Sequence, residues 1–566
     1  MNTIISSWRK LNNDILESIS AVVTDLNYKS AVFSVKDNRP ALERPKDKTH
    51  GDISTSFAME AAKMMGHPPR ELAEKIVARL NKNKPAGIDK IEVAGPGFIN
   101  FFVSNQWYCE IVKEIEKSGK NYGTGGSAAG QKIQFEFVSA NPTGPLNVVS
   151  ARAAAAGDCL ARLWEAIGAG VEREYYVNDT GNQVELLGKS VCARYDLLFG
   201  KSTPVPDEGY HGEYVSDIAK KVKESCGERY LDLPDTDRVT AFKDLALQEM
   251  LSKQQEDLDA FRIGRNLWHW SYEHELHPDG VNNAIQKLEK KGFVYETDRA
   301  KYFKSTELGD EKDRVLVKSD GQPTYFAADI AYHICKFERG FDRIIDIWGP
   351  DHHGHIARIK ASLGALGLDV KKMDILICQQ VNLISDGEKI KMSKRAGKLV
   401  TMKELLDEVG VDAARYFFLM RSMDSHLDFD LALAKKQSDE NPVYYIQYAH
   451  ARICSILKYA KEQNAPLVSA EKTNLGRLNS EQELALLKQM SRLPDLVESA
   501  ARTFSPHWLH SYLQELATSF HRFYTEHRVV TDDAELTSAR LCLIAGVKTV
   551  IANVLSLMGI SAPEKM

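Results

Sequence analysis

The hydrophobic period changes along the chain, and this change divides it into regions. In residues 132–138 apolar residues occupy every second position, from Ile133 to Phe137, which predicts a β-strand. After about residue 440 glycine becomes rare and apolar residues recur at helical spacing, in a stripe formed by Ile446, Ala449, Ile453, Ile456 and Ala460. We therefore expect an α/β part followed by an all-α bundle over residues 441–566.

Two further regions precede the helical part. Residues 1–105 combine an amphipathic helical pattern over 57–80 with two short strand-like segments around the Gly-Pro-Gly turn at 95–97. This combination predicts a small α/β domain. Residues 131–440 alternate strand-like segments, such as 343–348, with helical ones. This alternation predicts an α/β fold in which a parallel sheet carries helices on its faces.

Two segments of this α/β part are less regular. The polar stretch at about 190–280 is interpreted either as a helical insertion or as an ordinary solvated helical surface. Residues 106–130 contain the most glycine-dense segment of the chain, at 123–130. That segment has Gln131 where a phosphate-binding loop requires lysine, and it precedes a strand instead of following one. We therefore interpret 106–130 as a linker.

Composition and charge limit the class of protein. Of the 566 residues, 43% are hydrophobic and 27% are charged, as in folded soluble proteins. The 73 basic and 78 acidic residues give a net charge of −5, which argues against nucleic-acid binding by bulk positive charge but allows a local basic surface. The eight cysteines form no C-x-x-C pair, and Lys548 and Asn553 interrupt the longest apolar stretch. These features predict a cytoplasmic protein with reduced thiols and no membrane span.

The first candidate site is the strand, turn and helix unit that begins at residue 132. The strand runs into a proline- and glycine-containing turn at 139–145 and then into an alanine-rich helix. In α/β sheets ligands bind where strands end and helix N-termini present their N–H groups. Glu136 lies on this strand and needs a cationic partner if it is buried. The strand alone leaves open whether that partner is a ligand or an internal ion pair.

Two other segments carry candidate chemistry. The basic run at 389–397 holds four lysines and arginines and no acidic residue, so it could neutralise a polyphosphate or form a solvated loop. His352, His353 and His355 follow a predicted strand. No H-E-x-x-H pattern or cysteine partner accompanies them, so polar substrate contacts are favoured over zinc and no metal site is expected.

Together these segments resemble class I aminoacyl-tRNA synthetases, and in detail the arginyl-tRNA synthetases of bacterial type. The most specific motifs are residues 137–146, residues 324–332 and the KMSKR sequence at 391–395, which is similar to the family's KMSKS loop. Weaker similarities lie at 173–179, 425–430 and 441–450. The resemblance covers nearly the whole chain.

The resemblance implies a Rossmann-like (HUP-type) domain at 131–440, an N-terminal domain that contacts the tRNA elbow, and a helical anticodon-binding domain. It also implies a reaction in which the carboxylate of L-arginine attacks the α-phosphate of ATP, which enters with Mg²⁺, and pyrophosphate leaves. The arginyl-adenylate then acylates the 3′ end of tRNA(Arg), and the first step needs bound tRNA. We expect a monomer, because the sequence shows no heptad seam.

The resemblance also assigns residues. Arginine would be bound by Glu136, Asn141, Tyr325, Asp329 and His353. ATP would be bound by Pro142, Gly144, Asn147, Ser150, Gly349, Asp351, His352, Met392, Ser393 and Lys394, and the catalytic residues would be Lys391, Lys394, Asn147 and Ser150. For tRNA it implies Tyr444, Tyr448 and Arg452, although either tyrosine could instead belong to the core. Carboxylates beside a ring suit a planar guanidinium, and a lysine substrate would lose the bidentate fit.

The chain departs from the family at one motif. Where the family has a His-Val-Gly-His sequence, this chain has Asn147-Val148-Val149-Ser150. Asn147 and Ser150 retain hydrogen-bond donors, but Val149 adds bulk where glycine would let adenine approach the backbone. The alternative function is therefore a synthetase-like RNA-binding or regulatory protein that has lost adenylation. A third hypothesis, an ATP-dependent ligase acting on another acceptor, is disfavoured by the long helical C-terminal part.

Overall fold

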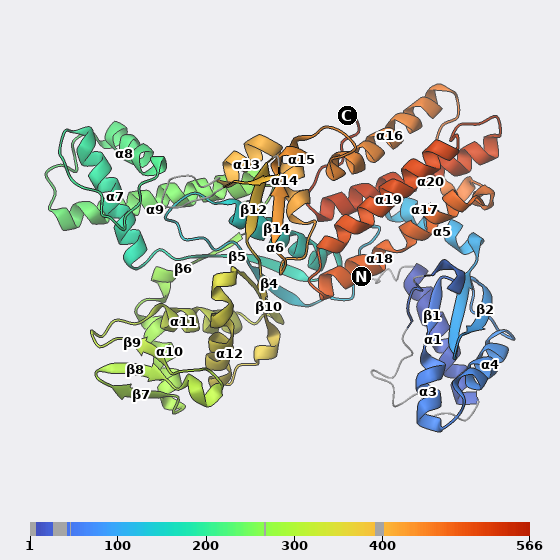
Figure 1. The fold of residues 1–566 in the computed structure, drawn as a ribbon, viewed down its shortest axis with the longest axis horizontal. Helices are drawn as coiled ribbons and strands as arrows, with labels where there is room; N and C mark the ends of the chain where they lie inside the picture. Colours follow the sequence, from blue (N-terminus) through green and yellow to red (C-terminus); the bar gives the residue numbers. More distant parts are fainter. Residues whose placement is uncertain (1–6, 26–41, 46, 265–267, 386, 391–400) are drawn as a thin grey trace.

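The computed structural model describes the whole chain except residues 1–6, 26–41, 46, 265–267, 386 and 391–400. The N-terminal domain lies to one side of the other regions (Figure 1). Its strands form an antiparallel sheet in the order β1-β3-β2. It is built from α1 (Ser7–Asp25), β1 (Ile53–Thr55), α3 (Phe57–Met65), α4 (Pro69–Leu80), β2 (Ile88–Ala94) and β3 (Phe98–Val103). The predicted small α/β domain is therefore present.

A five-stranded parallel sheet forms the centre of the protein, as the alternation of strands and helices predicts. Its spatial order is β11-β10-β4-β5-β6. The strands are β4 (Lys132–Glu136), β5 (Gly170–Val177), β6 (Trp268–Tyr272), β10 (Arg343–Trp348) and β11 (Met373–Ile377). The first strand in sequence therefore lies in the middle of the sheet.

Helices cover both faces of this sheet. Helix α6 (Val148–Ala166) packs against β4 and β5, and its core includes Ile133 and Phe135. Helix α11 (Tyr325–Glu338) covers the other face, which carries Glu136. The alternation of side chains along a strand explains the difference, because residues 133 and 135 point opposite to residue 136.

Two additions extend from the sheet. Helices α7 (Asn182–Leu198), α8 (Glu213–Cys226) and α9 (Asp235–Ala260) enclose their own apolar core, so the helical insertion is present, although it begins and ends earlier than expected. The second addition was not predicted and contains a three-stranded antiparallel sheet. Its elements are α10 (Asp279–Lys290), β7 (Val294–Thr297), β8 (Ala300–Phe303), β9 (Arg314–Val317) and α12 (Ile356–Ala365).

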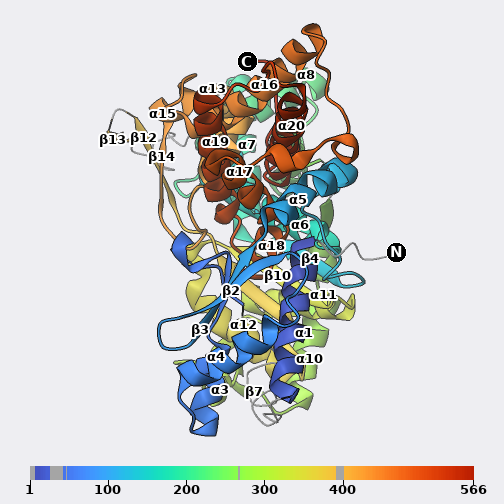
Figure 2. The same cartoon turned by 90° about the vertical axis from the view of Figure 1, so that its right-hand side faces the viewer.

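A junction region connects the central sheet to the C-terminal helices. It consists of β12 (Val381–Ser385), β13 (Glu388–Lys389), α13 (Met402–Val409), α14 (Val411–Phe418), β14 (Leu427–Asp430) and α15 (Leu431–Lys435). The helical bundle follows with α16 (Pro442–Glu462), α17 (Glu481–Ser491), α18 (Leu493–Arg502), α19 (His507–Glu526) and α20 (Ala534–Leu557). Figure 2 shows α17, α19 and α20 side by side, which confirms the all-α prediction.

Helix α20 is the one helix of the described residues that is long and apolar enough to cross a membrane. Most of its apolar window is buried, and it packs on α16, α17 and α19. A core helix of a bundle has these properties.

The segment expected to be a linker is partly helical. Residues Asn105–Ser118 form α5, which packs on α17 and α20. The buried side chains Tyr108, Ile111, Val112 and Ile115 account for this packing, because their spacing places them on one helix face. The glycine-dense part that follows packs on the end of α6, where the N–H of Gly125 donates to the carbonyl of Ala166 at 2.7 Å.

Candidate functional site

The site lies where the connections of the central sheet change direction. From β4 the chain continues through β5 and β6 on one side, and it later adds β10 and β11 on the other side. In an open parallel sheet this arrangement leaves a crevice at the carboxyl ends of the two central strands, where ligands bind. β4 ends at Glu136 and β10 ends at Trp348, so the segments after these residues form the site.

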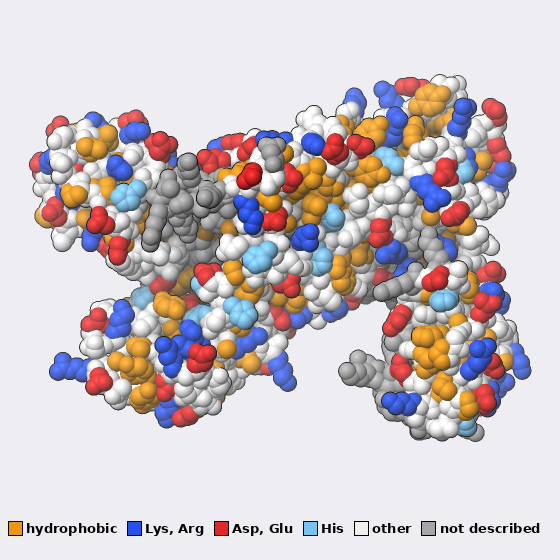
Figure 3. Space-filling model, in the orientation of Figure 1, with side chains coloured by type: hydrophobic (Ala, Val, Ile, Leu, Met, Phe, Trp, Pro, Cys, Tyr) orange, Lys and Arg blue, Asp and Glu red, His pale blue; other side chains and the backbone are white. Residues whose placement is uncertain are grey.

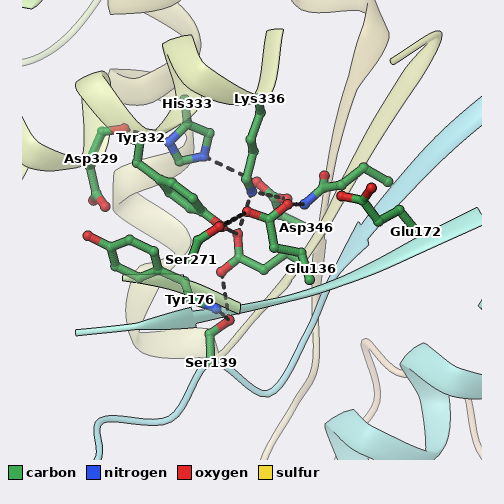
Figure 4. A network of polar contacts seen from close by, with 12 residues as sticks. Glu136, Ser139, Glu172, Tyr176, Ser271, Asp329, Tyr332, His333, Lys336 and Asp346 are labelled. Carbon is green, nitrogen blue, oxygen red and sulfur yellow. Dashed lines mark hydrogen bonds and ion pairs between the residues drawn. The ribbon is translucent and has the colours of Figure 1, made fainter. Parts of the chain in front are cut away.

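Three buried carboxylates form a row across the sheet at this edge. The strand register places Asp346 beside Glu136, and Glu136 beside Glu174. Residues paired in register point to the same face of a sheet, and all three are buried. Helix α11 covers this face and contributes Lys336 and Arg339, as Figure 4 shows for the lysine. The row is thus a charged cluster in the interior, not a solvated surface.

Lys336 supplies the ion pair that the sequence left as one alternative for Glu136. Its side chain is fully buried, its Nζ donates to Oδ1 of Asp346 at 2.7 Å, and it also contacts Oε2 of Glu136. Tyr332 Oη lies 3.0 Å from the same Oε2. The other carboxylate oxygen, Oε1, accepts a 2.8 Å hydrogen bond from Ser139 Oγ. Glu136 therefore has one oxygen with two partners on α11 and one oxygen with a single hydroxyl partner.

The carboxylates of the row differ in how well their charge is stabilised. Burial raises the pKa of Glu136, and the ammonium group of Lys336 only partly opposes this rise. Burial acts in the same direction on Glu174, but Lys336 and Arg339 outweigh it and hold the pKa of Glu174 below its usual value. The same holds for Asp346, whose pKa is lowered by Lys336 and His333 against the effect of burial. Glu136 is therefore the member of the row that gains most from a further cation.

One face of α11 carries two of the predicted arginine-binding residues. Tyr325, Asp329, Tyr332 and Lys336 follow one another at spacings of three and four residues, which places them in one stripe. Tyr325 begins the helix and is 67% exposed, whereas Lys336 lies inside. Asp329 is fixed by His355, whose Nε2 lies 2.7 Å from Oδ2. The structure thus brings Tyr325, Asp329 and Glu136 to the same end of the sheet.

The turn after β4 carries the next group of predicted residues. Asn141 is exposed, and its Nδ2 donates to Oε1 of Gln183 at 2.7 Å. Pro142 is buried, and the carbonyl of Gly144 accepts a 2.9 Å hydrogen bond from Nε2 of Gln254. The turn is therefore held by the inserted helices α7 and α9, which carry Gln183 and Gln254.

Asn147 caps helix α6. Its Oδ1 accepts hydrogen bonds from the N–H groups of Val149, at 2.9 Å, and Ser150, at 3.0 Å, and from Ser150 Oγ at 3.3 Å. Asparagine is among the best N-cap residues because it satisfies these otherwise unpaired donors. The departure from the family motif therefore places a good helix cap at this position. The Nδ2 group of Asn147 remains a donor at the N-terminus of α6.

The predicted residues after β10 lie in the short helix Pro350–His355. Asp351, His352 and His353 are exposed, and Gly349 precedes them. They follow the carboxyl end of β10 and so lie at the same edge as the carboxylate row. Within the part of the chain that the structure describes, no group of three His, Cys, Asp or Glu side chains could hold a metal ion.

The basic run is only partly described. Lys391, Met392, Ser393 and Lys394 lie outside the described residues. Strand β13 ends just before them, and Thr401 follows them in a bridge with Asn147. The N–H of Met402 also donates to the carbonyl of Leu146 at 2.8 Å. The described end of this segment is thus attached to the N-terminus of α6.

The sequence did not identify Lys336, Tyr332, Glu174 or Asp346 as site residues. A signal for the first two was present, because they continue the spacing set by Tyr325 and Asp329. Asp346 also interrupts an isoleucine-rich strand. No local pattern shows that these residues meet Glu136, since Lys336 is 200 positions away.

The predicted tRNA-binding residues lie on α16 in the helical bundle. Tyr448 is exposed, Tyr444 is half-buried, and the guanidinium of Arg452 lies 5.8 Å from the Tyr448 ring centroid and 4.9 Å from that of Tyr524. Figure 3 shows basic and acidic side chains interspersed over the visible face, as the near-neutral net charge suggests. The aromatic and cationic groups on α16 form a surface that could stack on bases.

Comparison with known proteins agrees with this geometry. Family models match residues 10–103 (arginyl tRNA synthetase N terminal domain), 112–425 (tRNA synthetases class I (R), catalytic domain) and 446–566 (DALR anticodon binding domain). The chain is 47% identical over 570 residues to an Arginine–tRNA ligase of Oceanobacillus iheyensis, covering 100% of both chains. It is 47% identical to that of Carboxydothermus hydrogenoformans, covering 93% of this chain and 94% of the relative.

A solved structure shows the same fold. The arginyl-tRNA synthetase of Thermus thermophilus superposes with a TM-score of 0.73 at 21% identity, over 98% of this chain and 99% of that one. The matched domains occur in the same order as the α/β domain, the parallel sheet and the helical bundle described above. The chain therefore belongs to the arginyl-tRNA synthetase family.

Proposed function

We propose that this protein is an arginine–tRNA ligase, which activates L-arginine with ATP and transfers it to the 3′ end of tRNA(Arg). The observation that carries the proposal is the 47% identity to an Arginine–tRNA ligase over the full length of both chains. The carboxylate row at the switch point of the sheet supports it, because a cationic amino acid needs such a site. We further propose that the enzyme acts as a cytoplasmic monomer.

The substrate guanidinium is proposed to bind between Glu136 and Asp329. Two groups of α11 engage Oε2 of Glu136, whereas Oε1 accepts a hydrogen bond only from Ser139. Oε1 of Glu136 can therefore still accept a hydrogen bond from a bound cation. Tyr325 would pack against the side chain of the substrate, and Asn141 and His353 would contact its amino acid end. A planar guanidinium can reach two carboxylates at once, which an ammonium group does less well.

ATP is proposed to bind along the turn after β4 and the N-terminus of α6. Pro142 and Gly144 would line the nucleotide, and Gly349, Asp351 and His352 would approach it from the end of β10. Ser150 Oγ and Nδ2 of Asn147 would donate to phosphate oxygens at the helix N-terminus. Lys391 and Lys394, with Met392 and Ser393 between them, would neutralise the charge that develops as pyrophosphate leaves. Mg²⁺ would enter with ATP and bridge its phosphate oxygens.

The tRNA is proposed to contact both ends of the protein. The N-terminal domain would touch the tRNA elbow, and Tyr444, Tyr448 and Arg452 of α16 would contact the anticodon loop. The alternative of an adenylation-deficient RNA-binding protein is not favoured. Its motivation was the sequence at 147–150, and Asn147 caps α6 there while keeping a donor at the helix N-terminus.

The proposal is tested by transfer of labelled arginine to tRNA(Arg). We expect the wild-type protein to charge this tRNA with arginine and not with lysine. Asp329→Ala should lower kcat/KM for arginine by about 100-fold, because it removes one of the two carboxylates proposed to pair with the guanidinium. Glu172→Gln is the matched control, since Glu172 lies on β5 outside the row and pairs with Arg339, and its kcat/KM should stay within about twofold of wild type. Failure of the folded wild-type protein to charge tRNA, or equal transfer of lysine, would contradict the proposal.

A further inference from the structure

We infer that Lys336 is a positioning residue of the arginine pocket, which keeps Glu136 ionised and fixed so that its Oε1 is available to the substrate guanidinium. The inference rests on the proposed function and adds to it a residue that does not touch the substrate. Lys336 lies on the inner part of the α11 stripe whose outer part carries Tyr325 and Asp329. Helix α11 thus carries Tyr325 and Asp329, which are proposed to contact the substrate, and also Lys336, which holds Glu136 in place.

The contacts of Lys336 fix it in one place. Its side chain is fully buried. Its ammonium group is shared between Asp346 and Glu136 and lies 4.5 Å from the ring centroid of Tyr332. A buried ammonium with two carboxylate partners has little freedom to move, and each partner is in turn held by it. The position of the Glu136 carboxylate is therefore set from the interior side.

No other described cation could replace Lys336 at this carboxylate. Arg339, one turn further along α11, donates to Oε2 of Glu174 at 2.7 Å and pairs with Glu172. The ring of His333 contacts Asp346 instead of Glu136, with Nε2 3.1 Å from Oδ2. Among the described residues, Lys336 is the only one in an ion pair with Glu136.

The groups that face Glu136 explain why the lysine matters. They are Lys336 and Tyr332 from α11, Asp346 from β10, and Glu174 and Tyr176 from β5. Two of these five are carboxylates on the strands either side of β4, and neighbouring strands lie only about 4.8 Å apart. Like charges at this distance favour protonation of one member.

Loss of Lys336 would therefore favour the protonated form of Glu136. Burial already raises the pKa of Glu136, and Lys336 makes the largest contribution in the opposite direction. Without the lysine, the pKa of Glu136 would rise further. A protonated carboxyl group loses its charge attraction to the guanidinium, so the substrate would have to bind a neutral site or expel a proton. Each pH unit by which the pKa exceeds the pH then weakens binding about tenfold.

The test measures arginine binding by titration calorimetry between pH 6 and pH 8.5, with the full-length protein and its variants. We expect Lys336→Met to bind arginine at least about tenfold more weakly than wild type at pH 7, and to recover affinity as the pH rises. Lys336→Arg keeps the cation, so its pH profile should match that of the wild type. A merely structural role of Lys336 would lower the melting temperature without introducing a pH-dependent Kd.

Arg339→Met is the matched control, because it removes a neighbouring cation that pairs with Glu174 of the row and makes no ion pair with Glu136. Its arginine affinity should stay within about threefold of wild type, with an unchanged pH profile. If Lys336→Met does not fold, the charge-balanced variant Lys336→Met/Asp346→Asn carries the same test with a smaller but still pH-dependent loss, because the Asp346 charge that also raises the pKa of Glu136 is gone. Wild-type affinity and pH profile in either folded variant would overturn the inference. If the wild-type protein binds no arginine at any pH, the proposed function fails instead.

Discussion

Removal of the Arg415 guanidinium should destabilise the whole protein, because this group connects three of its regions. Arg415 is fully buried on α14. Its Nε donates to the carbonyl of Met558 at 2.7 Å, one terminal nitrogen donates to the carbonyl of Phe261 at 2.9 Å, and the other donates to Oδ2 of Asp158 at 2.5 Å. These partners lie just after α20, just after α9 and on α6. The Arg415 side chain thus links the helical bundle, the helical insertion and α6, whose N-terminus is proposed to bind ATP.

The expected loss follows from what Arg415→Met leaves behind. Methionine fills part of the space but leaves two carbonyl oxygens without these donors. Asp158 keeps Arg162 at 2.8 Å and Arg173 at 3.4 Å. Leaving a buried acceptor without its donor typically costs about 1–3 kcal/mol, and Asp158 also loses the nearest of its three cations. We therefore expect the free energy of unfolding to fall by about 3–5 kcal/mol at pH 7.

The loss should also depend on pH. Burial would raise the pKa of Asp158, but Arg415, Arg162 and Arg173 together hold it below its usual value. A carboxylate whose folded pKa is depressed contributes stability above its unfolded pKa of about 4, and this contribution fades as the pH falls through the folded pKa. The difference between wild type and Arg415→Met should therefore be largest near neutral pH and shrink in acid.

Urea unfolding followed by far-UV circular dichroism and tryptophan fluorescence measures this difference. Arg522→Met is the control, since Arg522 pairs with Glu526 on the surface of α19, and it should leave the free energy of unfolding nearly unchanged. A loss below about 1 kcal/mol for Arg415→Met at pH 7, or a loss that grows in acid, would refute the reasoning.

Three further predictions concern other parts of the protein. Asn147→Ala removes the cap of α6 and should lower the free energy of unfolding by about 1 kcal/mol in urea titrations, whereas Asn147→Asp should retain most of it. Gly157→Ala should lower the melting temperature, because a Cβ there would lie 2.3 Å from the ring of Phe137; an unchanged temperature would contradict this close packing. Binding of tRNA(Arg), measured by filter retention, should weaken steadily with salt because the contacts neutralise phosphates, and a flat response would contradict it.

The sequence predicted the elements of the central sheet better than their arrangement. Alternation over 132–138 and the apolar run over 343–348 correspond closely to β4 and β10. The order of the strands depends on packing between segments far apart in the chain, which no local period reports. The same limit applies to α5, whose apolar spacing was visible but whose partners α17 and α20 lie more than 350 residues away.

The site shows the same division between local and long-range information. The motifs after β4 and at the start of α11 predicted two binding segments, and the structure places both at the same end of the sheet. The alternation along β4 could not decide between a ligand and an internal partner for Glu136, because Lys336 is 200 positions away and buried. Likewise, the sequence presented Asn147 as a lost histidine, and only the geometry of the first turn of α6 revealed its role as a cap.

Arginine-dependent exchange of pyrophosphate with ATP, measured with and without tRNA(Arg), tests the central claim most directly. It reports formation of the adenylate itself, independently of the later transfer to tRNA. We predict exchange when arginine, ATP and tRNA(Arg) are all present, and none when tRNA is omitted. Absence of exchange under both conditions, from folded protein that still binds tRNA, would contradict the claim that Asn147 and Ser150 support the chemistry of this site.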